Sequence, residues 1–314
     1  MKWLALILFG TLALISSSVY SKDDEKNELE KLAEVTRNLP RAIRAEMIVQ
    51  KYHVLYPSAD LSRLGKKELE LRFASADVAT FYSHDDVIAG EMLDIYKLLR
   101  AKEVRRPEEL SAVAGAQIIS RSFSRLDGMQ EIGPLPKEFN VPEIDNKVVE
   151  VNANWQILRP SAGKLIRDVY PIDQGKFVVV ISNPLCGFSE AASKVIESDK
   201  DLSVFFSKHG LWLVPPARRL YDVDVIEWNK SHSSQKMVLA YKTNNWPIID
   251  DWSTPIFYFL ENGIVVDKIV GWPKNGQNLG QLRAAIERFT HRARKSSQGY
   301  EEEQLSSQGP SSAP

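Results

Sequence analysis

Apolar side chains in the first part of the chain recur with the period of an α-helix. One such stretch carries Ile43, Met47 and Tyr52 and stops before Pro57. This spacing gathers the apolar side chains on one helix face, and a proline beyond the last turn ends the helix. Similar stretches follow one another with short polar joints between them. The pattern predicts an all-α helical domain over residues 22–130, either a bundle that packs on the next domain or a short helical-repeat array with a partner-binding groove.

Glycine and proline interrupt this helical pattern after residue 130. They lie at Gly133, Pro134, Pro136 and Pro142. Residues of this kind favour turns and irregular backbone over a periodic element. The segment 131–146 is therefore predicted to be a linker with few contacts, which a protease would cut.

Beyond this segment, short apolar runs alternate with amphipathic stretches. The run Lys176–Ser182 is rich in β-branched residues, which is typical of a central buried strand. Further strands are predicted at Lys147–Leu158, Leu211–Val214, Pro255–Leu260 and Ile264–Val270, the last two forming a hairpin. Helices are predicted at Ser189–Ser198, Val223–Tyr241 and Leu279–Arg294. The order predicts an α/β domain over residues 147–292, followed by a disordered tail at 293–314.

Composition narrows the classes of function. The 314 residues include 40 Lys and Arg against 41 Asp and Glu, a net charge of −1, and 44% hydrophobic residues. This balance is compatible with two folded domains and argues against binding to nucleic acid or to an anionic membrane surface. The single cysteine, Cys186, excludes an intrachain disulfide framework, a zinc site built on several cysteines and an intrachain Cys-x-x-Cys couple.

The first residues combine a basic start, an apolar run and several small side chains. Lys2 precedes an apolar stretch from Trp3 to Ile15, and serines follow as far as Ser21. This pattern is typical of a cleaved secretory signal peptide, predicted here as residues 1–21. The alternative is an uncleaved membrane anchor, but the apolar run is short of the roughly 20 residues that span a bilayer. We expect an exported protein without stable membrane insertion, periplasmic in the first place, or else secreted or in the ER lumen.

The lone thiol stands where a predicted strand passes into a predicted helix. Cys186 precedes Gly187, a residue that allows a tight turn. Free backbone N–H groups and the dipole at a helix start lower the pKa of a thiol, and the thiolate is the form that attacks disulfides. Ser189 lies three residues further on, where its hydroxyl can donate a hydrogen bond to the sulfur. The alternative is an inert buried cysteine.

Two sequence motifs occupy corresponding elements of this predicted domain. The first is Phe-Val-Val-Val-Ile-Ser-Asn-Pro-Leu-Cys-Gly-Phe-Ser at Phe177–Ser189, and the second is Ser-Thr-Pro-Ile-Phe-Tyr-Phe-Leu-Glu-Asn-Gly at Ser253–Gly263. Through them, residues 147–292 resemble the thioredoxin-like superfamily in a monothiol Cys-x-x-Ser form. In thioredoxins a resolving cysteine stands at the position of Ser189, so the resemblance implies that a mixed disulfide at Cys186 cannot be resolved within the chain.

The resemblance also implies the surroundings of the thiol. In the thioredoxin fold the corresponding proline is cis and packs beside the active cysteine, and the residue before it pairs with an extended substrate segment. Carried over, Pro255 is expected to be a cis-proline close to Cys186, with Thr254 as the substrate ledge. The other residues expected to line the substrate groove are Gly187, Phe188 and Trp252.

Three functions remain open at this point. The first is monothiol thiol–disulfide exchange, or covalent holding of client or redox-partner proteins, with glutathione as a co-substrate and no bound cofactor or metal. The second is a non-catalytic binding module in which the helical domain supplies the partner surface. The third arises because Cys-Gly-Phe-Ser is similar to the motif of monothiol glutaredoxins, which bind an iron–sulfur cluster with glutathione. Where glutaredoxins carry a glycine pair, this chain has Gly271-Trp272, so the third function ranks last.

Overall fold

The computed structural model describes residues 24–102, 107–129, 132–146, 150, 153–161, 163–273, 276 and 278–291. The predicted signal peptide at 1–21 and the predicted tail at 293–314 lie outside the described residues. Within the described part, no helix is both long enough and apolar enough to cross a membrane.

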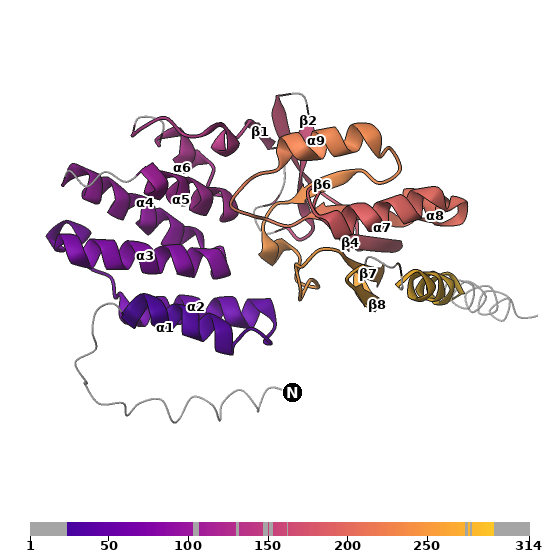
Figure 1. The fold of residues 1–314 in the computed structure, drawn as a ribbon, viewed down its shortest axis with the longest axis horizontal. Coiled ribbons are helices and arrows are strands. Elements are labelled where there is room, and N and C mark those ends of the chain that lie inside the picture. Colours follow the sequence, from indigo (N-terminus) through magenta and orange to yellow (C-terminus); the bar gives the residue numbers. More distant parts are fainter. Residues whose placement is uncertain are drawn as a thin grey trace, which may run out of the picture.

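The N-terminal part of the described chain is built from helices (Figure 1). Asp85 shows how the sequence sets their limits, because its carboxylate accepts hydrogen bonds from the N–H groups of Val87 and Ile88 and thereby caps a helix. The helices are α1 (Asp24–Val35), α2 (Arg41–Leu55), η1 (Leu61–Arg63), α3 (Lys66–Ser83), α4 (Asp86–Ala101), α5 (Pro107–Ile119), α6 (Ser124–Asp127) and the short η2 (Lys137–Phe139).

An eight-stranded mixed sheet follows, with the strand order β1-β3-β2-β6-β5-β4-β7-β8 among the described residues. Its centre is parallel, since β4 pairs with β5 and β5 pairs with β6 in the same direction, whereas β7 runs antiparallel to β4. The strands are β1 (Glu143–Asn146), β2 (Gln156–Ser161), β3 (Lys164–Val169), β4 (Lys176–Ile181), β5 (Gly210–Val214), β6 (Met237–Ala240), β7 (Ile256–Glu261) and β8 (Ile264–Val270).

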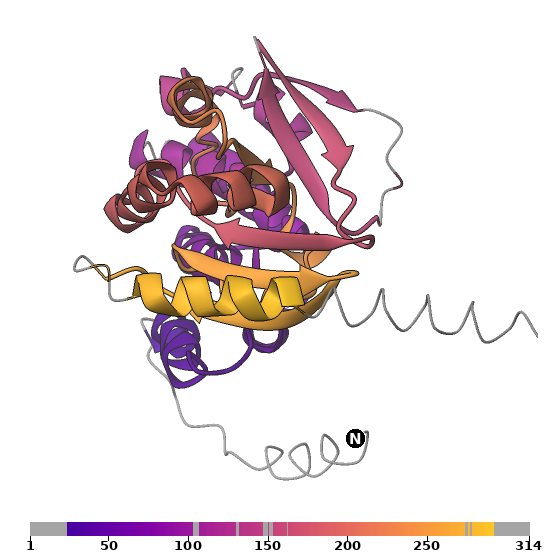
Figure 2. The same ribbon diagram turned by 90° about the vertical axis from the view of Figure 1, so that its right-hand side faces the viewer.

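Different parts of the chain cover the two faces of this sheet. Val178 and Val180 belong to the cluster that includes α7 (Gly187–Ser198), α8 (Lys200–His209), α9 (Asp222–Ser231) and the helix over 278–291. Val179 and Ile181 belong instead to a cluster with Trp246 and other loop residues. Side chains of a strand alternate between faces, so β4 is apolar throughout because both of its faces are covered. Figure 2 shows the C-terminal helix lying along β7 and β8.

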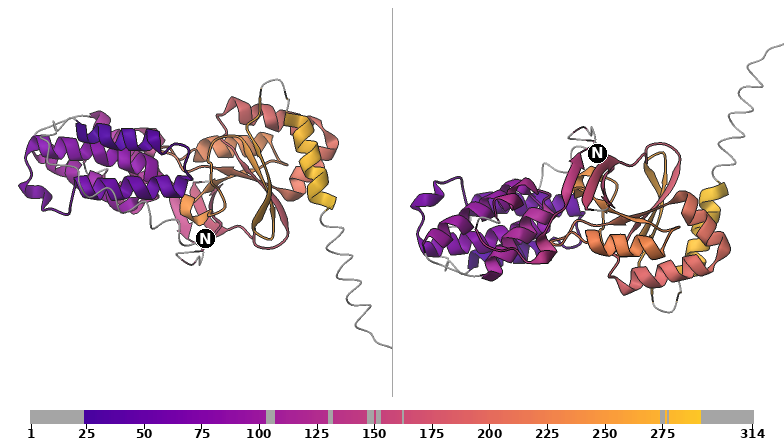
Figure 3. Two further views of the ribbon diagram at one scale, coloured as in Figure 1. Left: turned by 90° about the horizontal axis from the view of Figure 1, so that it is seen from below. Right: turned by 90° about the horizontal axis from the view of Figure 1, so that it is seen from above.

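The helices α1–α6 lie beside the sheet, next to the carboxyl end of β6, rather than over one of its faces (Figure 3). Arg121, which is 4% exposed, donates hydrogen bonds from Nε to the carbonyl of Tyr241 at 2.6 Å and from Nη2 to the carbonyl of Ala240 at 2.7 Å, just where β6 ends. Lys242 pairs with Asp86 of α4 at 2.9 Å. One continuous hydrophobic cluster includes residues of both parts.

Replacing Arg121 with glycine should destabilise the protein by about 3 kcal/mol, because hydrogen bonds to charged groups contribute about 1.5–3 kcal/mol each. The arginine has a φ of 61°, a conformation that glycine adopts freely, so the loss would come from the guanidinium and not from the backbone. Denaturant unfolding measures the change. Arg63→Ala, at a side chain 85% exposed, is the control and should change the free energy of unfolding by under about 0.5 kcal/mol. An Arg121→Gly protein as stable as the parent would contradict the prediction.

Two segments differ from the expectation drawn from the sequence. The predicted linker 131–146 contains η2 and ends in β1, which pairs with β3, and its Phe139 and Ile144 pack against the main core. Apolar residues stand singly in this segment, Phe139 before Pro142 and Ile144 after it, and each packs on the core without forming a periodic pattern. The predicted helix Val223–Tyr241 ends at Ser231, and Met237–Ala240 forms the fully buried strand β6. Four consecutive apolar residues suit a strand covered on both faces.

Candidate functional site

Cys186 lies at the carboxyl edge of the sheet, between the end of β4 and the start of α7. It is the N-cap residue of α7, and its carbonyl accepts the first helical hydrogen bond from Glu190 N–H at 3.0 Å. Asn183 shapes the preceding turn: its side chain accepts from Leu185 N–H at 2.8 Å, and its carbonyl accepts from Cys186 N–H at 3.0 Å. The thiol therefore occupies the position where a serine or aspartate oxygen commonly caps a helix.

This position lowers the pKa of the Cys186 thiol. Burial raises the pKa, but hydrogen bonds from Thr254 and from the backbone and hydroxyl of Ser189 outweigh it, with a further backbone contribution from Phe188. The N–H groups of a first helical turn have no partner within the helix, so they are available to the sulfur and favour its charged form. The carbonyl of Thr254 lies 3.7 Å from Sγ, where it can accept a hydrogen bond from the protonated thiol.

Ser189 is completely buried beneath the thiol. Its hydroxyl oxygen accepts a hydrogen bond from Asn183 N–H at 3.4 Å, which leaves the hydroxyl hydrogen free to point to Cys186. Serine thus supplies a fixed hydrogen-bond donor at the position from which a second thiol would face the sulfur.

The structure brings the Thr254–Pro255 segment to the thiol, as the sequence analysis expects. Ile181 of β4 pairs with Ile256 of β7, so the residues that precede β7 lie beside those that follow β4. The Thr254–Pro255 peptide bond is cis. The carbonyl of Pro255 accepts from Gly271 N–H at 2.9 Å, which ties the segment to the end of β8.

The thiol is flanked by exposed apolar side chains. Leu185 is 60% exposed and Phe188 is 46% exposed. Phe188 is one of the residues expected in the groove; Leu185 is not, although the sequence shows an apolar residue in the loop before the cysteine. An exposed apolar pair beside a reactive group is typical of a surface that contacts another molecule.

Gly187 differs from its expected role. Its φ is not in the left-handed region, and an added Cβ would meet nothing within 4 Å. Gly187 was expected to allow a tight turn, and the backbone here does not make use of that freedom. Its expected place in the substrate groove stays a prediction. The same open space leaves the helix start accessible above the sulfur.

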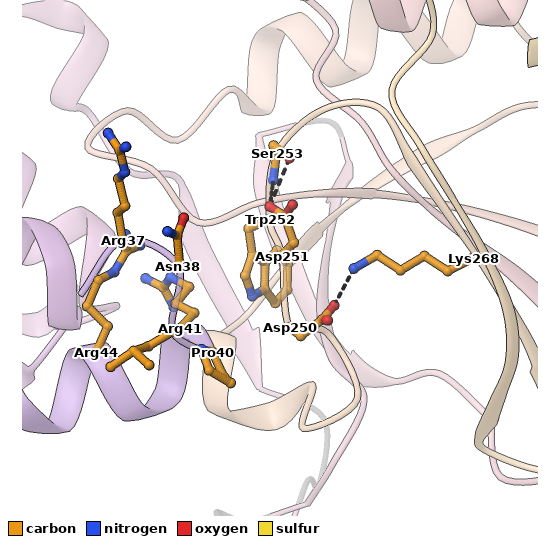
Figure 4. A pocket seen from close by; sticks show the side chains of 11 residues that line it. Arg37, Asn38, Pro40, Arg41, Arg44, Asp250, Asp251, Trp252, Ser253 and Lys268 are labelled. Atoms are coloured by element: carbon orange, nitrogen blue, oxygen red, sulfur yellow. Dashed lines mark hydrogen bonds and ion pairs between the residues drawn. The ribbon is translucent and has the colours of Figure 1, made fainter. Parts of the chain in front are cut away.

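Trp252 lies apart from the contacts of the thiol. It stands in a cleft between the sheet edge and α2, together with Asp250, Asp251 and Ser253 (Figure 4). Asp251 accepts hydrogen bonds from both the N–H and the hydroxyl of Ser253, at 2.9 and 2.8 Å. Trp252 is thus two residues from Thr254 but belongs to a neighbouring depression that sequence reasoning did not identify.

Comparison with family models, with curated proteins and with solved structures finds no match for this chain. Among the residues that the structure describes, no three histidine, cysteine, aspartate or glutamate side chains are placed to share a metal ion. The chemistry that the geometry supports directly is that of an accessible thiol with a lowered pKa, beside a backbone carbonyl and two exposed apolar side chains.

Proposed function

We propose that the protein is an exported, thioredoxin-like monothiol protein that exchanges thiols with disulfides of client proteins or holds those clients covalently. The observation that carries the proposal is the position of Cys186 at the N-cap of α7, with hydrogen bonds that lower its pKa. The neighbouring cis peptide and the strand order β5-β4-β7-β8 support the thioredoxin-like part of the proposal.

The reaction balances without a bound cofactor. The Cys186 thiolate attacks one sulfur of a client disulfide, forms a new bond between Sγ and that sulfur, and releases the other sulfur as a thiolate that takes a proton from water. One disulfide is broken and one is formed, so no electrons leave the pair. Because the chain has one cysteine, it has no second thiol to resolve the mixed disulfide. The client leaves either when its own freed thiolate attacks and restores the original disulfide, or when an external thiol, such as glutathione, attacks and takes over the bond.

Alkylation of Cys186 as a function of pH tests whether the fold activates the thiol. Iodoacetamide reacts with the thiolate, so we expect the rate to reach half its maximum at a lower pH than for an unstructured cysteine peptide measured alongside. Ser189→Ala removes a donor to the charged form, which should move the midpoint upward and slow alkylation at neutral pH.

Ser193→Ala is the matched control for this experiment. Ser193 is also fully buried on α7 but lies one turn further from the helix start, so its removal should leave the midpoint unchanged. A midpoint in the parent protein at or above that of the unstructured cysteine peptide, or equal profiles for Ser189→Ala and the parent, would refute activation of the thiol by this site.

The second candidate is a binding module without thiol chemistry. The exposed Leu185 and Phe188 favour it, because they offer an apolar contact surface whether or not the sulfur reacts. In that case Cys186→Ala would keep a full-strength partner complex, and the parent protein would form no mixed disulfide with glutathione disulfide.

A further inference from the structure

A cleft separates the start of α2 from the loop that leads to Thr254. It comprises a wider depression of about 510 Å³ and a smaller cavity of about 340 Å³, and Arg41, Arg44 and Trp252 line both. Figure 4 shows the arginines on the helical side of the wider depression, and Trp252 on the side of the sheet. The cleft exists only where the two parts of the chain meet.

Two arginines in this cleft lack an acidic partner. Neither Arg41 nor Arg44 forms an ion pair with any residue in the described ranges, and Arg44 Nε is buried without a hydrogen-bond partner. Most other charged groups nearby have a partner of opposite charge: Asp250 pairs with Lys268 at 2.7 Å, Arg218 with Asp77 at 2.7 Å, and Arg37 with Glu34 at 2.7 Å. The carboxylate of Asp251, which also lines the wider depression, accepts hydrogen bonds from the N–H and hydroxyl of Ser253. The half-buried Arg44 guanidinium lies over the ring of Tyr82, with Cζ 5.6 Å from the ring centroid, but this contact leaves Nε without an acceptor. A buried donor of this kind is costly unless a ligand supplies an acceptor.

The helix itself makes these arginines more unusual. Arg41 and Arg44 lie in the first turn of α2, which contains no acidic residue. A helix start carries partial positive charge and favours anions, so two cations there oppose the local preference. Burial and the neighbouring Arg44 lower the pKa of Arg41 to about 10, which leaves it charged at neutral pH. Arrangements that conflict with local preferences are expected at functional sites.

The rest of the smaller cavity is mostly apolar. His84 contributes an Nδ1 without a partner, and burial, followed by the charges of Arg41, Arg121 and Arg218, lowers its pKa well below the usual value, so the ring is neutral at pH 7. The apolar and aromatic walls come from Phe81, Tyr82, Ile119, Pro215, Pro216 and Trp252. A neutral ring and apolar walls beside two cations suit a ligand that has an apolar body and one negative group.

The cleft and the thiol are close enough for one short chain segment to reach both. Trp252 and Thr254 are two residues apart, so their Cα atoms are separated by at most about 7 Å. The Thr254 carbonyl lies 3.7 Å from the sulfur of Cys186. The cleft lined by Trp252 and the thiol therefore lie within the reach of a short peptide segment.

We infer that the cleft between α2 and the 250–253 loop binds a peptide carboxylate with an apolar neighbour, held by Arg41 and Arg44, and so selects the client segment presented to Cys186. The inference deepens the proposed function and rests on it for the identity of the client. The binding step itself does not need the thiol. The carboxylate comes either from a free C-terminus or from an acidic side chain next to an apolar one.

Calorimetric titration of the full chain carrying Cys186→Ala tests the binding step alone. The first probe pair is acetyl-Ala-Ala-Leu as the free acid and as the amide; the second is acetyl-Ala-Glu-Leu-Ala amide and its Gln analogue. We expect at least one charged peptide to bind about tenfold more tightly than its neutral partner, a difference of about 1.4 kcal/mol. The pair that shows the difference identifies the source of the carboxylate. Added salt should weaken the binding.

The arginine variants locate the site. Arg41→Gln and Arg44→Gln should each abolish the preference for the charged peptide, whereas Arg63→Gln, at an exposed side chain on η1, should retain it. Equal affinity for charged and neutral peptides in the Cys186→Ala protein would overturn the inference even if both arginine variants failed to fold. A preference that survives both substitutions would overturn it as well. Thiol exchange is measured separately with glutathione disulfide, so failure of one proposal is distinguishable from failure of the other.

Discussion

Cys186→Ala should abolish every covalent adduct of the protein while leaving its fold intact. Cys186 is the single cysteine of the chain. Mass spectrometry after incubation with glutathione disulfide is therefore expected to show full modification of the parent and none of the variant. The sulfur is only partly buried, so its removal leaves no large cavity and should cost little stability.

Ser189→Ala provides the comparison for this experiment, because it keeps the nucleophile and should still form the adduct, at a slower rate. An unmodified parent protein under conditions that modify free cysteine would contradict the prediction. It would also favour the binding module over thiol exchange.

Ser189→Cys should convert the monothiol site into one that closes an internal disulfide. Residue 186 is the N-cap of α7 and residue 189 is fully buried three positions further on, with its side chain directed to the sulfur. The expected result is the loss of both free thiols after mild oxidation, together with dithiol reductase or oxidase activity that the parent lacks. Thiol counting by mass measures the first effect.

Ser193→Cys is the matched control for the internal disulfide. Its side chain is equally buried on the same helix, but four further residues carry it about 6 Å along the helix axis, which puts the pair beyond the usual range for a disulfide. Two free thiols should therefore remain in that variant. Two free thiols in oxidised Ser189→Cys would show that residues 186 and 189 do not face each other.

Local sequence was sufficient where one element determines its own structure. Three elements form as predicted: the strand in the run at Lys176–Ser182, the helix that follows Cys186, and the hairpin around Asn262. Each depends on a signal that spans only a few positions, namely a short β-branched run, the start of a helix and a turn residue. The short strand at Met237–Ala240 was missed, since four apolar residues after a helix carry no period of their own.

The candidate site divides in the same way. Cys186 and Ser189 lie three residues apart on one helix start, so their proximity was predictable, whereas the place of Thr254 followed from a resemblance between motifs. The cleft lined by Arg41 and Trp252 forms only where the start of α2 comes to lie opposite the 250–253 loop, and these two segments are far apart in the sequence. Two arginines in the first turn of a predicted helix could be noticed in the sequence, because acidic residues are preferred there. The neighbouring sequence does not show which distant residues face them.

The buried hydroxyl of Ser189 has a kinetic consequence for the proposed exchange. An enzyme with two thiols releases its partner at a rate set by its own geometry, independent of the surroundings. With a hydroxyl at this position, release in the reduced form depends on thiols outside the protein, so the lifetime of a mixed disulfide whose client has no free thiol in reach is inversely proportional to their concentration. The fraction of molecules carrying a client at steady state therefore reports the reducing capacity of the compartment, so that the same protein would retain its partners in an oxidising medium and discharge them in a reducing one.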